Sequence, residues 1–249
     1  LNYKIQKASQ YPNISGVIFL IHGYGSNYDD LFSFKTYLPK NLSIISLEAP
    51  IKIEMGGFAW YSINYNQNFE KWSNNEEAIL SIKQIYQTIN TLLKKYNLNV
   101  DDISLLGFSQ GAILSWALGF NYPNLIRRVI ALSGYINEDL INNNNNNLSF
   151  KAFASHGITD PIIPIDWPRN TIKKYIKKDN DDLIFKEYND GHTVSENNLI
   201  DLLTDIIYLE LSKYIKNTFK TTEYLIYNFS IEKSLHTTDY FSLIYKTDK

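Results

Sequence analysis

The sequence predicts an α/β fold with a mostly parallel central sheet and helices on both faces. Short apolar runs alternate along the chain with longer stretches in which apolar residues recur at helical spacing. Several of the short runs are apolar at nearly every position, which is typical of strands that helices cover on both faces. Strands that alternate with helices are joined by right-handed crossovers, and such crossovers produce a parallel sheet.

Six strands are expected, each a short run that is mostly apolar. They lie at 16–21, 42–47, 103–106, 128–132, 150–154 and 183–188.

Three helices are expected between and after these strands. The first begins at the capping box Ser73-Asn74-Asn75-Glu76, and apolar residues such as Ile79 repeat behind it up to Tyr96. The second covers 111–122 and is apolar on nearly every side, so we expect it to be buried. The third runs from about Glu196 to Lys216.

The composition excludes several classes of function. The chain has 249 residues, of which 44% are hydrophobic and 20% are charged, as in a folded globular protein. Its net charge of −2 provides no electrostatic attraction for nucleic acid or for an anionic membrane. Cysteine is absent, which excludes disulfides, thiolate metal sites and a cysteine nucleophile. The four histidines form no His-x-x-x-His pair, and we expect no metal site.

The sequence also bears on location. No apolar run approaches the roughly 18 residues that a membrane-spanning helix needs, and the first residues lack the apolar region of a signal peptide. A cytoplasmic location is therefore expected, although removal of a signal before Leu1 stays open. The asparagine run at 142–147 is expected to be a surface loop.

A candidate nucleophile follows the strand at 103–106. The motif Gly107-Phe108-Ser109-Gln110-Gly111 lies between this strand and the buried helix. A strand–turn–helix of this kind holds the serine in a strained conformation with its Oγ exposed at the sheet edge. Its glycines are needed because a Cβ there would collide with the neighbouring strand or helix. The motif would arise by chance roughly 0.04 times in a chain of this composition, so a nucleophile is favoured over a packing turn.

A serine hydroxyl needs a neighbouring base to take its proton, and four histidines compete for this role. His192 lies just past the last expected strand, in the segment 188–192, and is our candidate. We interpret the other three as structural: His156 as part of a turn, His22 before a glycine-rich loop, and His236 in the C-terminal part.

The third member of such a group is a carboxylate that orients the imidazole. Asp160 is our candidate, because it occupies the loop after the strand at 150–154. Asp190 is too close in sequence to His192 to reach its far nitrogen easily. Asp166 and Asp181 are interpreted as helix-cap or surface carboxylates.

Two backbone N–H groups are candidates for an oxyanion hole. The N–H of Gln110 lies at a helix N-terminus, where it can face a developing negative charge. The second is expected from the loop after the first strand, His22-Gly23-Tyr24-Gly25, and we assign it to Tyr24. A phosphate-binding loop is the alternative here, but the chain contains neither glycine-rich nucleotide motif.

Taken together, these motifs resemble the phospholipase/carboxylesterase family of α/β-hydrolases, which includes the acyl-protein thioesterases. The matching segments are Phe19-Leu-Ile-His-Gly-Tyr-Gly25, Glu48-Ala-Pro50, Gly56-Gly-Phe-Ala-Trp-Tyr61, Leu105-Leu-Gly-Phe-Ser-Gln-Gly-Ala112, Ala131-Leu-Ser-Gly134, His156-Gly-Ile-Thr-Asp-Pro-Ile-Ile-Pro164 and Gly191-His192.

The resemblance implies a fold, an activity and a set of roles. It implies an α/β-hydrolase catalytic domain at 14–216, followed by a C-terminal extension of unknown structure at 217–249. By position, Ser109 would be the nucleophile, His192 the base and Asp160 its orienting carboxylate, in the chain order of α/β-hydrolases. The activity implied is hydrolysis of carboxylic esters or thioesters without a cofactor. The chain departs from many relatives at Ser62, where they carry an acidic residue.

The substrate-binding residues are sought in an aromatic segment at 58–72. We expect this segment to form a loop over the site, in which Phe58, Trp60 and Phe69 line an acyl groove together with Ile162 and Ile163. The alternative is a hydrophobic cluster packed under a long loop.

Two alternative functions stay open: a peptidase on the same fold, and a non-catalytic binding module that retains the fold. The expected substrate is a small, lipid or protein-bound acyl ester or thioester. The sequence predicts neither the acyl chain nor the leaving group, and it leaves open whether the chain forms a homodimer.

Overall fold

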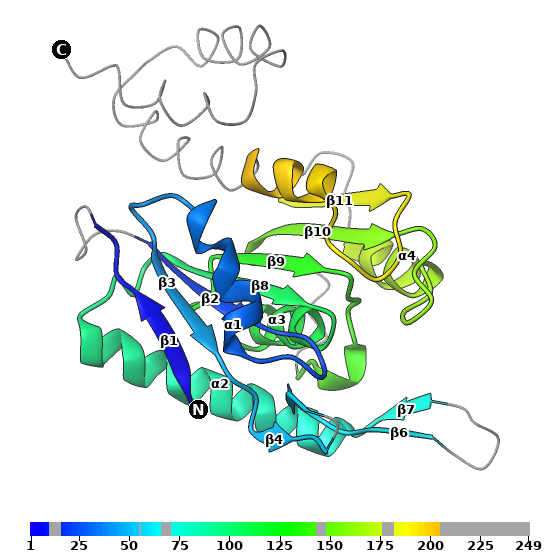
Figure 1. Ribbon diagram of the computed structural model, residues 1–249, viewed down its shortest axis with the longest axis horizontal. Helices are drawn as coiled ribbons and strands as arrows, with labels where there is room; N and C mark the ends of the chain where they lie inside the picture. Colours follow the sequence, from blue (N-terminus) through cyan, green and yellow to red (C-terminus); the bar gives the residue numbers. More distant parts are fainter. Residues whose placement is uncertain (10–15, 55, 66–70, 143–147, 176–181, 205–249) are drawn as a thin grey trace, which may run out of the picture. The chain divides into compact units, whose positions relative to one another are not determined.

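The computed structural model describes residues 1–9, 16–54, 56–65, 71–142, 148–175 and 182–204. A seven-stranded sheet forms the centre, with the strand order β1-β3-β2-β8-β9-β10-β11 (Figure 1). All neighbours pair in parallel except β1, which pairs antiparallel with β3. The strands are β1 (Tyr3–Gln6), β2 (Val17–Ile21), β3 (Ser43–Leu47), β8 (Ile103–Phe108), β9 (Arg128–Leu132), β10 (Lys151–Gly157) and β11 (Leu183–Tyr188).

The six expected strands are all present, and the predicted fold class is confirmed. Every residue of β2 and β3 is buried, as expected for strands covered on both faces. The seventh strand, β1, was not predicted. Its residues are only partly buried, and it lies at the sheet edge, where a short segment needs little apolar sequence. The sheet therefore includes residues that precede position 14, where the catalytic domain was expected to begin.

Helices connect the strands. They are α1 (Tyr28–Phe32), α2 (Asn75–Tyr96), α3 (Gln110–Asn121) and α4 (Asp166–Ile172), and residues 196–204 are also helical. Short 3-10 turns occupy Ser33–Thr36, Glu138–Leu140 and Lys173–Tyr175. No helix among the described residues is long and apolar enough to cross a membrane.

The long helix α2 begins one residue later than the capping box predicted. Ser73 belongs to β7, where it pairs with Ile63, and is not the N-cap. Asn74 caps the helix instead, because its side chain accepts from the N–H of Glu77. The buried face agrees with the predicted helical spacing, but Ile79 lies on the exposed face.

The second expected helix is confirmed as α3, which is buried from Gln110 to Phe120 and packs against β8 and β9. It starts directly after Ser109, so this serine is the single residue that connects β8 to the helix. A buried helix placed this way fixes the serine relative to the sheet.

The aromatic segment differs from the expected loop. It contains the short strands β5 (Phe58–Ala59), β6 (Ile63–Tyr65) and β7 (Lys71–Ser73). β5 pairs antiparallel with β4 (Ile51–Lys52), and β6 pairs antiparallel with β7.

Several expectations lie outside the described residues. They are the C-terminal extension at 217–249 with His236, the end of the third helix at Lys216, most of the asparagine run, Phe69 and Asp181.

Candidate active site

The candidate residues follow four parallel strands. Tyr24 comes after β2, Ser109 after β8, Asp160 after β10 and His192 after β11. The carboxyl ends of parallel strands lie at one edge of a sheet, and residues far apart in sequence meet there.

The turn at Ser109 has the strained geometry that its motif predicts. Ser109 adopts φ 54° and ψ −116°, which non-glycine residues rarely occupy, and its N–H donates to the Leu132 carbonyl at 2.9 Å. A Cβ on Gly107 would lie 2.3 Å from the backbone of Gly111, and one on Gly111 would lie 1.8 Å from the Ile21 carbonyl oxygen. Both glycines are therefore required for the close approach of strand and helix.

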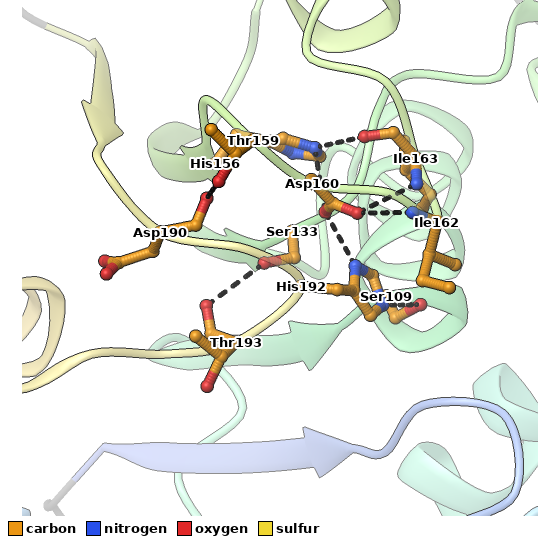
Figure 2. A network of polar contacts seen from close by, with 10 residues as sticks. All are labelled: Ser109, Ser133, His156, Thr159, Asp160, Ile162, Ile163, Asp190, His192 and Thr193. Atoms are coloured by element: carbon orange, nitrogen blue, oxygen red, sulfur yellow. Dashed lines mark hydrogen bonds and ion pairs between the residues drawn. The ribbon is translucent and has the colours of Figure 1, made fainter.

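A continuous hydrogen-bond chain joins three of the candidate residues (Figure 2). His192 Nε2 lies 2.9 Å from Ser109 Oγ, and His192 Nδ1 lies 2.7 Å from Asp160 Oδ2. The other carboxylate oxygen, Oδ1, accepts from the N–H groups of Ile162 and Ile163 at 2.8 and 3.0 Å. In a neutral imidazole the carboxylate selects the tautomer with its proton on Nδ1, which leaves Nε2 free to accept from the serine hydroxyl.

The loop that carries Asp160 is hydrogen-bonded to the loop that carries His192. Both the N–H and the hydroxyl of Thr159 donate to the Asp190 carbonyl, at 3.1 and 2.9 Å. A Cβ on Gly157 would lie 2.2 Å from the Gly191 carbonyl oxygen, so the two loops pass in direct contact. Asp190 thus contributes its backbone to this junction, while the carboxylate at the imidazole belongs to Asp160.

Both candidate oxyanion donors line the same cavity as Ser109. Within the described part of the chain, the N–H groups of Tyr24 and Gln110 donate to no other protein group. The Gln110 side chain is occupied, because it accepts from the Trp60 N–H at 3.1 Å and donates to the Tyr61 carbonyl at 2.7 Å. These two bonds fix the start of α3 against the segment that follows β5.

The cavity has a volume of about 450 Å³, and Ser109 and His192 are among the residues that line it. Its wall is mostly apolar and includes Ile63, Ile113, Tyr135, Ile162, Ile163 and Trp167. The rings of Tyr135 and Trp167 pack edge to face, with centroids 5.2 Å apart. Burial raises the pKa of the Tyr61 and Tyr135 hydroxyls, so both present neutral side chains to the cavity.

Comparison with known proteins places this arrangement in a family. The family model for Phospholipase/Carboxylesterase matches residues 4–210. The chain belongs to this family. It is therefore a carboxylic ester hydrolase, and the resemblance in its sequence motifs is confirmed.

Curated relatives of this family member include acyl-protein thioesterase 1 of two yeasts. The protein of Kluyveromyces lactis is 28% identical, over 80% of this chain and 94% of the relative. That of Candida albicans is 29% identical, over 82% of this chain and 91% of the relative.

Solved structures share the fold. The carboxylesterase of Bacillus cereus superimposes with a TM-score of 0.67 at 17% identity, covering 83% of this chain and 93% of the other. The acyl-protein thioesterase 2 of Zea mays gives a TM-score of 0.64 at 15% identity, covering 83% of this chain and 98% of the other.

The structure corrects two of the substrate-binding residues expected in this hydrolase. Ile162 and Ile163 line the cavity, but Trp60 and Phe58 do not. Trp60 is fully buried, and its Nε1 donates to the His22 carbonyl at 2.8 Å, so it supports the loop of Tyr24 from behind. Phe58 packs in part against the core. The third aromatic residue, Phe69, lies outside the described residues.

The sequence analysis missed several residues of the cavity wall, among them Ile63, Ile113, Tyr135 and Trp167. The strand-end rule could have found Tyr135, because it follows β9 by three residues. Ile113 was recognised only as part of a buried helix, because its sequence pattern does not show which side faces the cavity.

Two of the remaining histidines are buried near the site. His22 Nε2 accepts from the Ala49 N–H at 3.1 Å, which is the structural role expected for it. His156, however, lies inside strand β10 and not in a turn as expected. Burial lowers the pKa of both imidazoles, which favours their neutral forms. Among the described residues, no group of three or more acidic or histidine side chains could hold a metal ion.

Proposed function

We propose that this chain hydrolyses acyl esters and thioesters through an acyl-enzyme intermediate on Ser109. The observation that carries the proposal is the hydrogen-bond chain from Ser109 Oγ through His192 to Asp160, whose first two members line a mostly apolar cavity. A serine becomes a nucleophile when a base held by a third group takes its proton, and these three side chains have that geometry.

In the acylation step, Ser109 Oγ attacks the substrate carbonyl carbon while its proton passes to His192 Nε2. The carbonyl oxygen becomes an oxyanion, which the N–H groups of Tyr24 and Gln110 would stabilise. Asp160 stabilises the imidazolium that forms. The tetrahedral intermediate then collapses, its bond to the leaving alkoxide or thiolate breaks, and His192 returns the proton to the departing oxygen or sulfur.

Deacylation repeats these steps with water. His192 takes a proton from a water molecule, whose oxygen attacks the acyl-serine carbonyl carbon. The second tetrahedral intermediate expels Ser109 Oγ, which recovers its proton from the imidazolium. The products are a carboxylic acid and the free enzyme.

The substrate we propose is an acyl chain that enters the apolar part of the cavity. Ile162, Ile163, Tyr135 and Trp167 offer it a hydrophobic wall. The relatives named acyl-protein thioesterase support a thioester of an acylated protein as the substrate class. A homodimer and a cytoplasmic location stay predictions.

A chain-length series tests this proposal. Each methylene buried in the cavity contributes about 0.8 kcal/mol, which is about fourfold in kcat/KM. We expect p-nitrophenyl esters and acyl thioesters to be cleaved faster from acetate to hexanoate. Trp167→Ala should flatten this rise and barely change acetate cleavage, because Trp167 lines the cavity at 43% exposure.

Tyr37→Ala is the matched control, because Tyr37 is a similarly exposed aromatic side chain, at 46%, that does not line the cavity. A wild-type protein that binds these esters without hydrolysing them would support the binding-module alternative. Cleavage of peptides but not of esters would support a peptidase.

A further inference from the structure

The structure brings a second imidazole to the carboxylate of Asp160. His156, the next-to-last residue of β10, is completely buried. Its Nε2 lies 3.2 Å from Asp160 Oδ2, the oxygen that also faces His192 Nδ1, and 2.8 Å from the Ile163 carbonyl oxygen. The Asp160 carboxylate therefore lies between two histidines (Figure 2).

The surroundings of His156 define its protonation. Its Nε2 faces two oxygen acceptors, so a neutral ring must carry its proton on that nitrogen. Burial lowers the pKa of His156, against the opposing effects of the Ile163 carbonyl, the Asp160 carboxylate and the Gly134 backbone, while the nearby His192 lowers it further. His156 is thus a neutral donor shared between a carbonyl and the carboxylate.

These contacts close a ring. His156 Nε2–H faces the Ile163 carbonyl, the Ile163 N–H donates to Asp160 Oδ1, and Asp160 Oδ2 faces His156 again. The carboxylate side chain has no exposed surface, so each donor that it loses leaves a buried charge less well satisfied. With donors at both oxygens, the carboxylate plane is fixed in the orientation that meets His192.

We propose that His156 is a positioning residue of the active site, which holds the Asp160 carboxylate in the orientation that accepts from His192 Nδ1. This role rests on the proposed function. His156 does not line the cavity, and it reaches His192 only through Asp160, which it contacts directly and by way of Ile163. Both imidazoles face the same carboxylate oxygen.

The charged groups around His156 give the direction of the pH effect. Asp160 and His192 face it from the strand-end loops, and Glu187 is its register partner on β11. Glu187 is paired with Arg169 of α4 at 2.7 Å, so its charge is largely balanced. When the His156 donor is removed, the carboxylate is no longer held in place and can turn away from His192 Nδ1. The cation that His192 forms during catalysis then loses the carboxylate that balances its charge.

The test compares His156→Leu, which removes the donor, with His156→Gln, which keeps an N–H donor at a similar distance. We expect His156→Leu to lower kcat about ten- to a hundredfold, the scale of a displaced reacting group, with KM nearly unchanged. The acid limb of its kcat/KM profile should move to lower pH, because the carboxylate no longer stabilises the protonated form of the base. His156→Gln should recover most of kcat and the wild-type acid limb.

Ile89→Ala is the control for general destabilisation, because Ile89 is a buried core residue of α2 that does not line the cavity. It should lower stability and leave the acid limb unchanged. If His156→Leu does not fold, His156→Asn takes its place, since the shorter amide retracts its donor from Asp160, and the same downward shift of the acid limb is expected.

The proposal is overturned if the donor-free variant keeps the wild-type kcat, or if it loses kcat while its acid limb stays in place. Either result is distinct from failure of the proposed function, in which the wild-type protein itself would hydrolyse no ester.

Discussion

Replacing Asp160 by asparagine keeps the shape of the side chain but removes its negative charge and one of its two acceptor oxygens. The two oxygens of Asp160 have different surroundings: Oδ1 accepts from two backbone N–H groups, and Oδ2 faces two imidazoles. An asparagine must keep its oxygen at the Oδ1 position, because an NH₂ group there would face two donors. Its NH₂ group then faces His192 Nδ1, which can only accept from it. The imidazole proton moves to Nε2, and the base can no longer take the proton of Ser109.

The expected loss follows from this change of tautomer. The corresponding substitution in a serine protease lowers kcat about 10⁴-fold, which is roughly 5.5 kcal/mol of transition-state stabilisation. The NH₂ group also faces the Nε2–H of His156, which keeps the Ile163 carbonyl as its acceptor, so the cost in the free energy of unfolding should be smaller than the roughly 1–3 kcal/mol of a fully unsatisfied donor. Steady-state kinetics with a short ester and urea unfolding measure the two effects separately.

Asp190→Asn is the matched control, because Asp190 contributes its backbone carbonyl and not its carboxylate to the junction of the loops. It should stay within a few-fold of the wild type. The reasoning is refuted if Asp160→Asn keeps more than about a tenth of the wild-type kcat, or if Asp190→Asn is the damaging variant.

Three further predictions concern the same molecule. Ser109→Ala and His192→Ala should each lower kcat by about 10⁴–10⁶, and the double variant should be little worse because the two act as a unit; additive losses in single-turnover assays would contradict this. Trp60→Ala should cost about 3–5 kcal/mol in unfolding free energy, measured with urea, because it empties a fully buried site and removes the bond to the His22 carbonyl. A flattened chain-length profile without loss of stability would show instead that Trp60 lines the cavity. Finally, stability should fall as the pH drops below about 6.5, because His22 and His156 have lowered pKa values in the folded protein and bind protons more readily when unfolded. The slope should reach at most about 1.4 kcal/mol per pH unit for each histidine, and His156→Gln should reduce it; an unchanged slope in that variant would show that His156 is not buried in its neutral form.

Much of the sheet and of the candidate site could be predicted from the sequence, because both depend on local patterns. Continuous apolar runs identified the six parallel strands, and each candidate residue was found directly after one of them. The turn at Ser109 could be predicted from its glycines, because a Cβ on Gly107 would collide with the motif itself and one on Gly111 with the neighbouring strand. The edge strand β1 was missed because its residues alternate between apolar and polar and are only partly buried.

Long-range contacts account for most of the errors. Trp60 was expected in the cavity wall, but its bond to the His22 carbonyl joins residues 38 positions apart and turns the ring into the core. The start of α2 moved because β6 pairs with Ser73 and removes it from the cap. His156 was interpreted as part of a turn because a glycine follows it. Its role depends on Asp160 and Ile163, which reach it only once the loop after β10 has folded back.

The most direct test of the account is covalent labelling with a fluorophosphonate, followed by mass spectrometry of the labelled peptide. The phosphonyl group attaches only to a serine whose proton a neighbouring base removes. We expect stoichiometric labelling of the wild-type protein at Ser109, much slower labelling of His192→Ala, and none of Ser109→Ala. A wild-type protein that stays unlabelled, or that is labelled at another serine, would contradict the assignment of Ser109 as the nucleophile.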